Sequence, residues 1–326
     1  MSDPYAFTLR ETGGPEVLEA ELIDVPAPGP GQVLVRHEAV GLNFIDTYHR
    51  SGLYKLPLPS GLGSEAAGVV ESVGDGVTDF RAGQRVGYFT GPLGAYASQR
   101  VIDADRLVKL PDSISAEEAA AAMLKGCTAE YLVERCARIV SGEPVLVHAA
   151  AGGVGSILVQ WLKALGATVI AHAGDSRKAA LAKELGADHT LCCPVEELAA
   201  EVRALTGGRG VPVVLDGVGA ASWTASLGSV ARRGLIVTYG NASGPVPPFT
   251  ALDLLSAGSI FVTRPTLGDY CPTPGEMRAS AARLFEMLER RTVDVRVGAR
   301  FPLTKAADAH RAIESRATTG SVILIP

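Results

Sequence analysis

The sequence predicts an α/β protein with a doubly wound parallel sheet and a separate β-rich domain. Three observations lead to this fold class: strands and helices alternate after residue 126, a glycine-rich turn opens the alternation, and short strands with frequent turns precede it. The chain has 326 residues, which exceeds one ordinary compact core, so we expect two domains.

The first third of the chain is rich in strand patterns. Apolar runs or alternations fall in four segments, at 17–25, 32–40, 68–74 and 82–89. The PAPGPG stretch at 26–31 cannot continue a strand. A helix is expected at about 115–125, with Ser115 as its N-cap. Short strands with glycine at their corners are typical of a small barrel-like domain.

From residue 126 onward, strand and helix patterns alternate. Six segments are predicted to be strands: 144–149, 167–171, 188–191, 211–215, 234–239 and 258–263. Helical patterns lie between most of them, at 156–165, 176–185, 195–205 and 222–231. This alternation predicts a parallel sheet with helices on its faces, and six strands is the full count of the dinucleotide-binding Rossmann fold.

The segment after residue 264 departs from this alternation. A loop rich in Pro and Gly is followed by a helix at about 276–290, the strand-like run VRVGARFPL, a helix at 304–316 and a terminal strand. We expect this tail to return to the first domain. That domain is then discontinuous, at 1–125 and 265–326, around a nucleotide-binding domain at 126–264.

Composition and charge argue against several classes of protein. Hydrophobic residues make up 47% of the chain and charged residues 20%, as in a globular protein. The net charge, 30 − 35 = −5, gives no general attraction to nucleic acid or anionic lipid. We expect no signal peptide and no membrane span. The five cysteines, an odd number, indicate reduced thiols and a cytoplasmic location.

The strongest local signal is the run VLVHAAAGGVGSILVQW. A strand is expected to end near Ala149 and a helix to begin near Ser156, with A-A-G-G-V-G between them. Compared with the pattern G-x-G-x-x-G, Ala150 replaces the first glycine, while Gly152 and Gly155 remain. Missing side chains let backbone N–H groups approach a pyrophosphate, and the helix N-terminus adds partial positive charge. A tight structural turn is the alternative, but the strand–turn–helix context favours a cofactor.

The second strand of the alternation indicates which cofactor binds. NAD-preferring sites usually carry an acidic residue at its tip, for the ribose 2′-OH. Here the strand ends in Ala-His-Ala-Gly at 171–174, and Asp175 lies one step farther along. Arg177 and Lys178 follow, and two cations suit a 2′-phosphate. NADPH is therefore favoured; the alternative is that both cations are solvated residues of the next helix.

Longer motifs extend over nearly the whole chain. Besides the glycine-rich run, they are NFIDTYHRSGLY at 43–54, PSGLGSEAAGVV at 59–70, VTYGNASG at 237–244, VTRP at 262–265 and ESRATTGS at 314–321. Together they resemble the quinone oxidoreductase (ζ-crystallin-like) family of the medium-chain dehydrogenase/reductase superfamily, in its bacterial NADPH:quinone reductase form. The resemblance implies a GroES-like catalytic domain, a Rossmann domain, a cleft between them, a quinone as hydride acceptor, and a homodimer.

The resemblance also implies cofactor contacts. By this resemblance Asn43, Asp46 and Tyr131 lie on the nicotinamide side, and Gly153 and Val154 contact the pyrophosphate. Gly174 and Lys178 contact the adenosine phosphate. The rest of the cofactor groove is lined by Tyr239, Gly240, Asn241, Arg264 and Arg316. Similar enzymes often place a Tyr near the 2′-phosphate, where this chain has Cys193. A thiol contributes little to phosphate binding, and Arg177 is the candidate to compensate.

No metal is expected at the site. Asn43 stands near the position where zinc alcohol dehydrogenases have a ligand Cys, and Ser64-Glu65 replaces their His-Glu pair. A quinone accepts a hydride without a Lewis acid, so the protein supplies orientation and a dry site. Asn43 and Tyr48 are the candidate catalytic residues. Tyr48 would donate a hydrogen bond to the acceptor oxygen; otherwise it is a packed aromatic residue.

Two other functions stay open. An NADPH-dependent reductase of activated alkenes, such as 2-alkenals or enones, needs similar hydride geometry. A non-catalytic NADPH-binding protein, crystallin-like or RNA-binding, is the second, although the acidic balance argues against RNA.

Overall fold

The computed structural model describes residues 3–326 and divides into two compact units. The first unit runs up to Cys127 and takes in Cys271–Glu289 and Val295–Pro326. The second comprises Thr128–Tyr270 and Arg290–Asp294. Compared with the expected division, residues 126–127 fall in the first unit, and residues 265–270 and 290–294 fall in the second. No helix in the described part of the chain is long and apolar enough to span a membrane.

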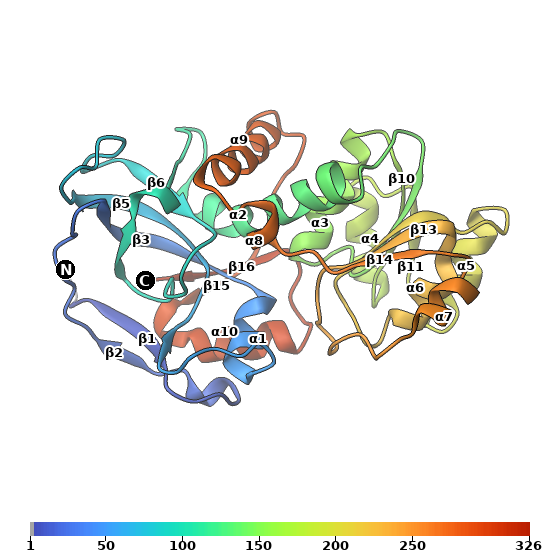
Figure 1. Cartoon of the computed structure of the whole chain (residues 1–326), viewed down its shortest axis with the longest axis horizontal. Coiled ribbons are helices and arrows are strands. Elements are labelled where there is room, and N and C mark those ends of the chain that lie inside the picture. Colours follow the sequence, from blue (N-terminus) through green and yellow to red (C-terminus); the bar gives the residue numbers. More distant parts are fainter. Residues whose placement is uncertain (1–2) are drawn as a thin grey trace. The chain divides into compact units, whose positions relative to one another are not determined.

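The second unit contains a six-stranded parallel sheet (Figure 1). The strand order is β11-β10-β9-β12-β13-β14, and every neighbouring pair is parallel. This is the 3-2-1-4-5-6 order of the doubly wound dinucleotide-binding fold, so the predicted fold class is confirmed. The strands are β9 (Pro144–Val147), β10 (Thr168–His172), β11 (His189–Leu191), β12 (Val211–Asp216), β13 (Val230–Thr238) and β14 (Phe261–Thr263).

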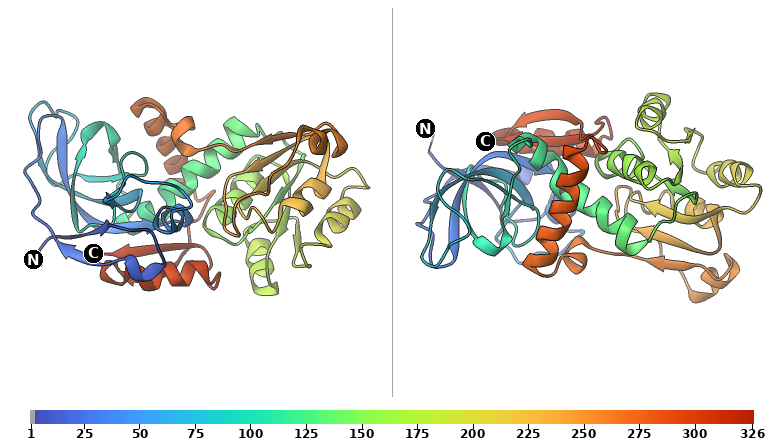
Figure 2. Two further views of the ribbon diagram at one scale, coloured as in Figure 1. Left: turned by 60° about the horizontal axis from the view of Figure 1, so that its bottom comes forward. Right: turned by 90° about the horizontal axis from the view of Figure 1, so that it is seen from above.

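Helices connect these strands and cover the sheet (Figure 2). They are α3 (Gly153–Ala164), α4 (Ser176–Glu184), α5 (Leu198–Leu205), α6 (Trp223–Ser229) and α7 (Ala251–Ser256). Because the crossovers of parallel strands are right-handed, α3 and α4 lie on one face of the sheet and α5 and α6 on the other. Buried Leu146, Ile170 and Val214 belong to the core cluster of this unit.

Several boundaries in this unit differ from the prediction: α5 and β14 each begin three residues later than expected, and two further differences have a local cause. Helix α3 begins at Gly153, three residues before Ser156, because the small residues after the N-cap Gly152 adopt helical geometry. Strand β13 begins at Val230, so the predicted helix at 222–231 ends at Ser229. Val230 is β-branched and fully buried, and it pairs with Val211 of β12, so sheet pairing prevails there.

The first unit contains two sheets. A three-stranded sheet has the order β2-β1-β4, and a seven-stranded sheet has the order β15-β16-β3-β5-β6-β8, with β7 also paired to β3. Strand β3 (Gln32–Leu42) is the longest and pairs with three neighbours. The remaining strands are β1 (Tyr5–Leu9), β2 (Ala20–Leu22), β4 (Ser60–Gly61), β5 (Glu65–Val73), β6 (Arg85–Tyr88), β7 (Gln99–Asp103), β8 (Val108–Lys109), β15 (Val297–Pro302) and β16 (Ser321–Ile325).

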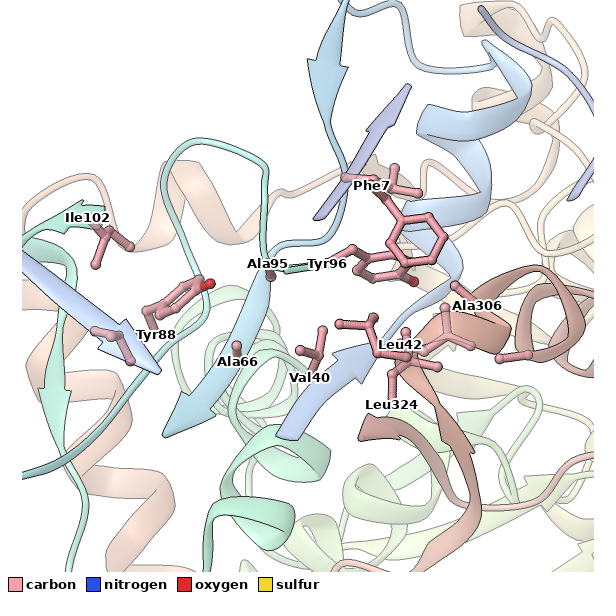
Figure 3. Packing of buried hydrophobic residues seen from close by; sticks show 14 of the residues in the cluster. Phe7, Val40, Leu42, Ala66, Tyr88, Ala95, Tyr96, Ile102, Ala306 and Leu324 are labelled. Carbon is pink, nitrogen blue, oxygen red and sulfur yellow. The ribbon is translucent and has the colours of Figure 1, made fainter. Parts of the chain in front are cut away.

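The C-terminal tail joins the first unit. Strand β16 pairs antiparallel with β3 and parallel with β15. Helix α10 (Ala306–Glu314) contributes Ala306 and Ile313 to a core that also holds Phe7, Tyr88 and Tyr96 (Figure 3). The other helices of this unit are α1 (Phe44–Ser51), α9 (Pro274–Glu289) and most of α2 (Ala116–Glu130), which continues into the second unit.

The predicted strand at 17–25 is largely wrong. Only Ala20–Leu22 pairs as β2, and Pro15–Val17 is a short 3-10 turn. Prolines at 26, 28 and 30 lack the N–H group that a neighbouring strand would need, so pairing cannot extend in that direction. The short strands β1 and β7 were not predicted, since five-residue elements with little periodicity leave a weak pattern.

Candidate cofactor and catalytic site

The glycine-rich turn follows β9 and leads into α3. Ala149 adopts a left-handed conformation with φ 50°, and Gly152 caps the helix in an extended conformation. A Cβ atom on Gly155 would overlap the carbonyl oxygen of Ala149, so only glycine allows this close packing of helix on strand. The first N–H groups of any α-helix lack acceptors within the helix. In α3 these belong to Gly153, Val154 and Gly155, which therefore form a suitable cradle for an anion.

The turn after β10 uses its carboxylate for helix capping. Asp175 is the N-cap of α4, and its side chain accepts a hydrogen bond of 2.8 Å from the backbone N–H of Lys178. The Lys178 ammonium group lies 3.7 Å from the same carboxylate. These contacts hold the pKa of Asp175 below its ordinary value, the Lys178 N–H being the largest cause. Gly174 has room for a Cβ atom, so the fold alone does not require glycine there.

Two neighbouring loops at the carboxyl ends of β12 and β13 are joined by backbone hydrogen bonds. Ser243 donates its backbone N–H to the Val218 carbonyl at 2.8 Å, and Ala220 donates to Gly244 at 3.0 Å. A Cβ on Gly240 would overlap the carbonyl of Gly217, so the backbones touch. This contact positions the segment Tyr239-Gly240-Asn241, which carries three predicted cofactor contacts.

The carboxylate of Asp216 organises these loops. It is fully buried and accepts hydrogen bonds from the N–H groups of Val218 and Gly219, at 2.8 and 3.2 Å. The hydroxyls of Ser222 and Ser226 also donate to it, each at 2.7 Å to Oδ2. Sequence reasoning missed Asp216. A charged residue that ends the apolar run VPVVL before Gly-Val-Gly was the available signal.

Tyr131 lies in a π-helical turn, Tyr131–Cys136, that continues α2. Its buried ring stacks on Tyr270 with ring centres 4.5 Å apart and an interplanar angle of 16°. Arg135 donates to the Tyr270 carbonyl at 2.6 Å, and its guanidinium lies 5.4 Å from the centre of the Tyr270 ring. The stack fixes the orientation of Tyr131, and Tyr270 is a second residue that sequence reasoning missed.

In the first unit, Asn43 is held by a buried carboxylate. Glu65 is fully buried, and its Oε1 accepts hydrogen bonds from Asn43 Nδ2 at 2.8 Å and from the Lys125 ammonium at 3.2 Å. Its Oε2 accepts from the backbone N–H of Leu124 at 2.7 Å. Because a carboxylate only accepts, the amide nitrogen of Asn43 must face Glu65. The orientation of Asn43 is therefore fixed by its partners.

These residues do not fit a zinc ion. Zinc needs Cys, His or carboxylate ligands in tetrahedral array. Both oxygens of Glu65 are occupied, and one of them faces the Lys125 cation, which would repel a metal ion. Within residues 3–326, no three His, Cys, Asp or Glu side chains are grouped as a metal site.

Asp46 and Tyr48 both lie on α1 and are both buried. Asp46 accepts a hydrogen bond of 2.9 Å from the backbone N–H of Asn43, which caps the helix. Tyr48 packs within an aromatic group, with its ring centre 5.3 Å from Tyr54 and 6.4 Å from Phe44. The packed arrangement agrees with the alternative named for Tyr48, and its hydrogen bond to an acceptor stays a prediction.

The predicted contacts divide between the two units. Asn43, Asp46, Tyr48 and Arg316 lie in the first. The others lie in the second, in the π-helical turn or beyond the carboxyl ends of parallel strands: Tyr131, Gly152, Gly153, Val154, Gly155, Gly174, Arg177, Lys178, Cys193, Tyr239, Gly240, Asn241 and Arg264. Carboxyl ends of parallel strands share one edge of a sheet, which is where open α/β sheets bind ligands. Burial raises the pKa of the Cys193 thiol, which keeps it neutral.

Comparison with known proteins matches both units. Residues 29–112 match the model of the alcohol dehydrogenase GroES-like domain, and residues 153–286 match that of zinc-binding dehydrogenase. The fold and site thus define a two-domain dehydrogenase of the medium-chain type. The chain belongs to the quinone oxidoreductase family of the medium-chain dehydrogenase/reductase superfamily.

Three relatives illustrate the similarity. The quinone oxidoreductase of Pseudomonas aeruginosa is 51% identical over 96% of this chain and 97% of its own. The crystal structure of Escherichia coli quinone oxidoreductase complexed with NADPH has a TM-score of 0.96 at 45% identity, over 99% of this chain and 100% of that one. The 2-haloacrylate reductase of Burkholderia is 42% identical over 98% of each chain.

Replacing Gly155 with alanine should weaken NADPH binding. The added methyl group would overlap the Ala149 carbonyl and push α3 away from the turn, which should raise the NADPH dissociation constant at least about tenfold. Fluorescence titration measures this. Gly268→Ala, where a Cβ has ordinary room, is the control and should bind like wild type. Unchanged affinity in Gly155→Ala would show that the turn does not hold the cofactor.

Proposed function

We propose that this protein is an NADPH:quinone oxidoreductase. The observation that carries the proposal is the glycine turn at the head of α3, where Gly155 allows backbone N–H groups to face an anion. Relatives at 46–51% identity are quinone oxidoreductases, and an E. coli relative is complexed with NADPH. When bound, NADPH supplies a hydride to the acceptor.

The residues of the chain then bind and orient. Gly153 and Val154 would hold the pyrophosphate, and Tyr239 and Asn241 would line the groove beside it. The buried Glu65–Lys125 pair would hold Asn43 in one orientation on the nicotinamide side. This arrangement would supply orientation and a dry environment. A quinone is reactive enough to need no further activation by the protein, and groups held in place in advance need little reorganisation during the reaction.

Preference for NADPH over NADH would arise from α4. Asp175, the carboxylate that follows β10 in sequence, caps α4 and faces Lys178, so its oxygens already have partners other than a ribose hydroxyl. Arg177 and Lys178 in the first turn of α4 would bind the 2′-phosphate. The neutral Cys193 thiol would add little.

A reductase of activated alkenes is the second candidate. The observation that favours it is the 42% identity to 2-haloacrylate reductase over 98% of both chains. Hydride transfer to a quinone or to an alkene conjugated with a carbonyl needs the same placement of donor and acceptor, so the fold permits either.

A homodimer is the assembly that we propose. Strand β14 is an edge strand of the six-stranded sheet, and its Phe261 is 63% exposed. Leu252 and Leu255 on the nearby α7 are 69% and 62% exposed. An apolar edge strand is a template for pairing with another chain, and a second copy would cover it. The odd number of cysteines, five, supports a cytoplasmic location.

An acceptor assay tests the activity. NADPH oxidation should be rapid with 1,4-benzoquinone and 9,10-phenanthrenequinone and slower with an enone, followed by the loss of NADPH absorbance. Turnover of the enone with no turnover of any quinone would replace the first candidate by the second. Tight NADPH binding without any turnover would identify a non-catalytic binding protein.

Replacing Lys178 with alanine should separate the two cofactors. Loss of a charged hydrogen bond, which contributes about 1.5–3 kcal/mol, should raise KM for NADPH at least about tenfold and leave KM for NADH within about twofold. Lys183→Ala at the other end of α4 is the matched control and should change neither. An equal rise for both cofactors would remove Lys178 from the phosphate site.

Replacing Phe261 with aspartate should produce monomers. A charge at the centre of an apolar interface leaves an unpaired buried carboxylate, which opposes association. Light scattering coupled to size-exclusion chromatography gives the mass. Leu22→Asp, at a 73% exposed position of β2, is the control and should keep the wild-type mass. A dimer in Phe261→Asp would rule out pairing through β14.

A further inference from the structure

A chain of buried polar side chains in the first unit leads from Arg50 to Asp46. Arg50 Nη1 lies 3.2 Å from Nδ1 of His310. The other ring nitrogen of His310 lies 2.9 Å from the Tyr96 hydroxyl, which lies 3.1 Å from Oδ2 of Asp46. Asp46, Tyr96 and His310 are fully buried and Arg50 is 3% exposed. The four residues come from α1, α10 and the segment before β7, so folding alone brings them together.

The partners fix where each proton lies. A guanidinium group only donates, so Nδ1 of His310 accepts from Arg50. Burial and the charge of Arg50 lower the pKa of His310 to about 3, so the ring is neutral and its one proton is on Nε2. That proton is donated to the Tyr96 oxygen, and the Tyr96 O–H is left to donate to Asp46. Every hydrogen bond in the chain therefore points toward the carboxyl group.

The two oxygens of Asp46 have different surroundings. Oδ2 accepts from Tyr96 and from the backbone N–H of Asn43. Oδ1 is buried and has no hydrogen-bond partner among residues 3–326. A proton bound to Asp46 would therefore sit on Oδ1. Burial raises the pKa of Asp46 from 3.8 to about 7, and the bonds from Asn43 and Tyr96 act in the opposite direction.

We propose that Tyr96 and His310 are positioning residues that, through this one-way chain of hydrogen bonds, favour the ionised form of Asp46 and so set the pH range of the reductase. The inference rests on the proposed function, since Asp46 then lies on the nicotinamide side. Loss of a hydride leaves the nicotinamide ring positively charged, and a nearby carboxylate stabilises that charge without touching it. A protonated Asp46 is neutral and would not stabilise the positive charge of the ring.

Other charges face Asp46 from neighbouring elements. Glu65 on β5 raises the pKa of Asp46 and Lys125 on α2 lowers it by less, and these two form an ion pair at 3.2 Å, so their effects oppose each other. Arg50 is paired with Glu314 of α10 at 2.6 Å. Within the described chain, the hydroxyl of Tyr96 is thus the side-chain donor that bonds Asp46 directly.

The same core offers a matched control. Tyr88 is also fully buried, and its hydroxyl lies 3.0 Å from Nε2 of His37. His37 donates its Nδ1 proton to the Ala97 carbonyl at 2.7 Å, so Nε2 accepts from Tyr88. Figure 3 shows Tyr88 and Tyr96 at separate places in the cluster. Tyr88→Phe removes a buried tyrosine–histidine bond without touching Asp46.

The first measurement uses the cofactor-free protein. Infrared difference titration follows the carbonyl band of the protonated carboxyl, assigned by its disappearance in Asp46→Asn. Tyr96→Phe should shift its midpoint upward by about one to two pH units. His310→Leu should give a smaller shift in the same direction, and Tyr88→Phe should give none. An unchanged midpoint in both Tyr96→Phe and His310→Leu would overturn the proposal.

Protein stability provides an independent readout with a definite sign. Between pH 3.8 and about 7, folded Asp46 keeps a proton that the unfolded chain releases. Its stabilising contribution is therefore complete below the lower value and lost as pH rises through the upper one. Tyr96→Phe should extend this decline to higher pH, whereas Asp46→Asn should remove it. Urea unfolding at a series of pH values measures the effect.

The kinetic measurement tests whether this chain of hydrogen bonds affects catalysis. The wild-type kcat for a quinone should rise with pH as Asp46 ionises. In Tyr96→Phe the pH at which kcat rises should shift upward by as many pH units as the infrared midpoint. At pH values above that rise, KM for NADPH should be unchanged. A wild-type profile identical to that of Asp46→Asn would overturn the link to catalysis. No quinone turnover in any variant, despite a shifted titration, would instead contradict the proposed function.

Discussion

A buried carboxylate needs hydrogen-bond donors, and the arrangement of the loops after β12 and β13 depends on the donors that bond to Asp216. Its four donors come from the ten residues that follow it, so the chain must turn back over the end of β12 instead of leaving the sheet. That turn brings Gly217 against Gly240 and aligns the segment after β13. Leaving any of these buried groups unpaired would cost about 1–3 kcal/mol, which opposes any movement of the loops that breaks these bonds. Hydrogen bonds within the chain itself thus hold these two loops together.

Glu65 has the same role in the first unit, with a different balance of charge. It carries a full cation partner, Lys125, so the pair is neutral and the remaining capacity of the carboxylate is available to orient Asn43. Asp46 lies three residues after Asn43, and no ion pair with a Lys or Arg side chain is seen for it within the described residues. Burial raises the pKa of Asp46 to about 7, so this carboxyl can take up and release a proton near neutral pH.

The sequence predicts the second unit well because its signals are local. Strand and helix periods, the glycine turn and the lack of a carboxylate at the tip of β10 each depend on adjacent residues, and the six predicted strands form a parallel sheet. The polar networks of the first unit could not be predicted because their members are far apart in the sequence. Tyr96 and His310 are 214 positions apart, and nothing in either neighbourhood indicates the other. Helix α3 began earlier than expected because glycine, a poor helix former, is tolerated where the strand packs too closely for any side chain.

The position of Asp175 shows how a cofactor preference can come from helix capping. A carboxylate near the tip of the second strand would ordinarily favour a ribose hydroxyl and repel a 2′-phosphate. Here the carboxylate lies one residue later, as the N-cap of α4, and its charge faces the backbone and ammonium group of Lys178. Because a helix N-terminus attracts negative charge, the cap and a phosphate both benefit from the same end of α4. At the N-cap position the Asp175 carboxylate therefore supports the helix that would bind the phosphate, where a carboxylate at the strand tip would oppose phosphate binding.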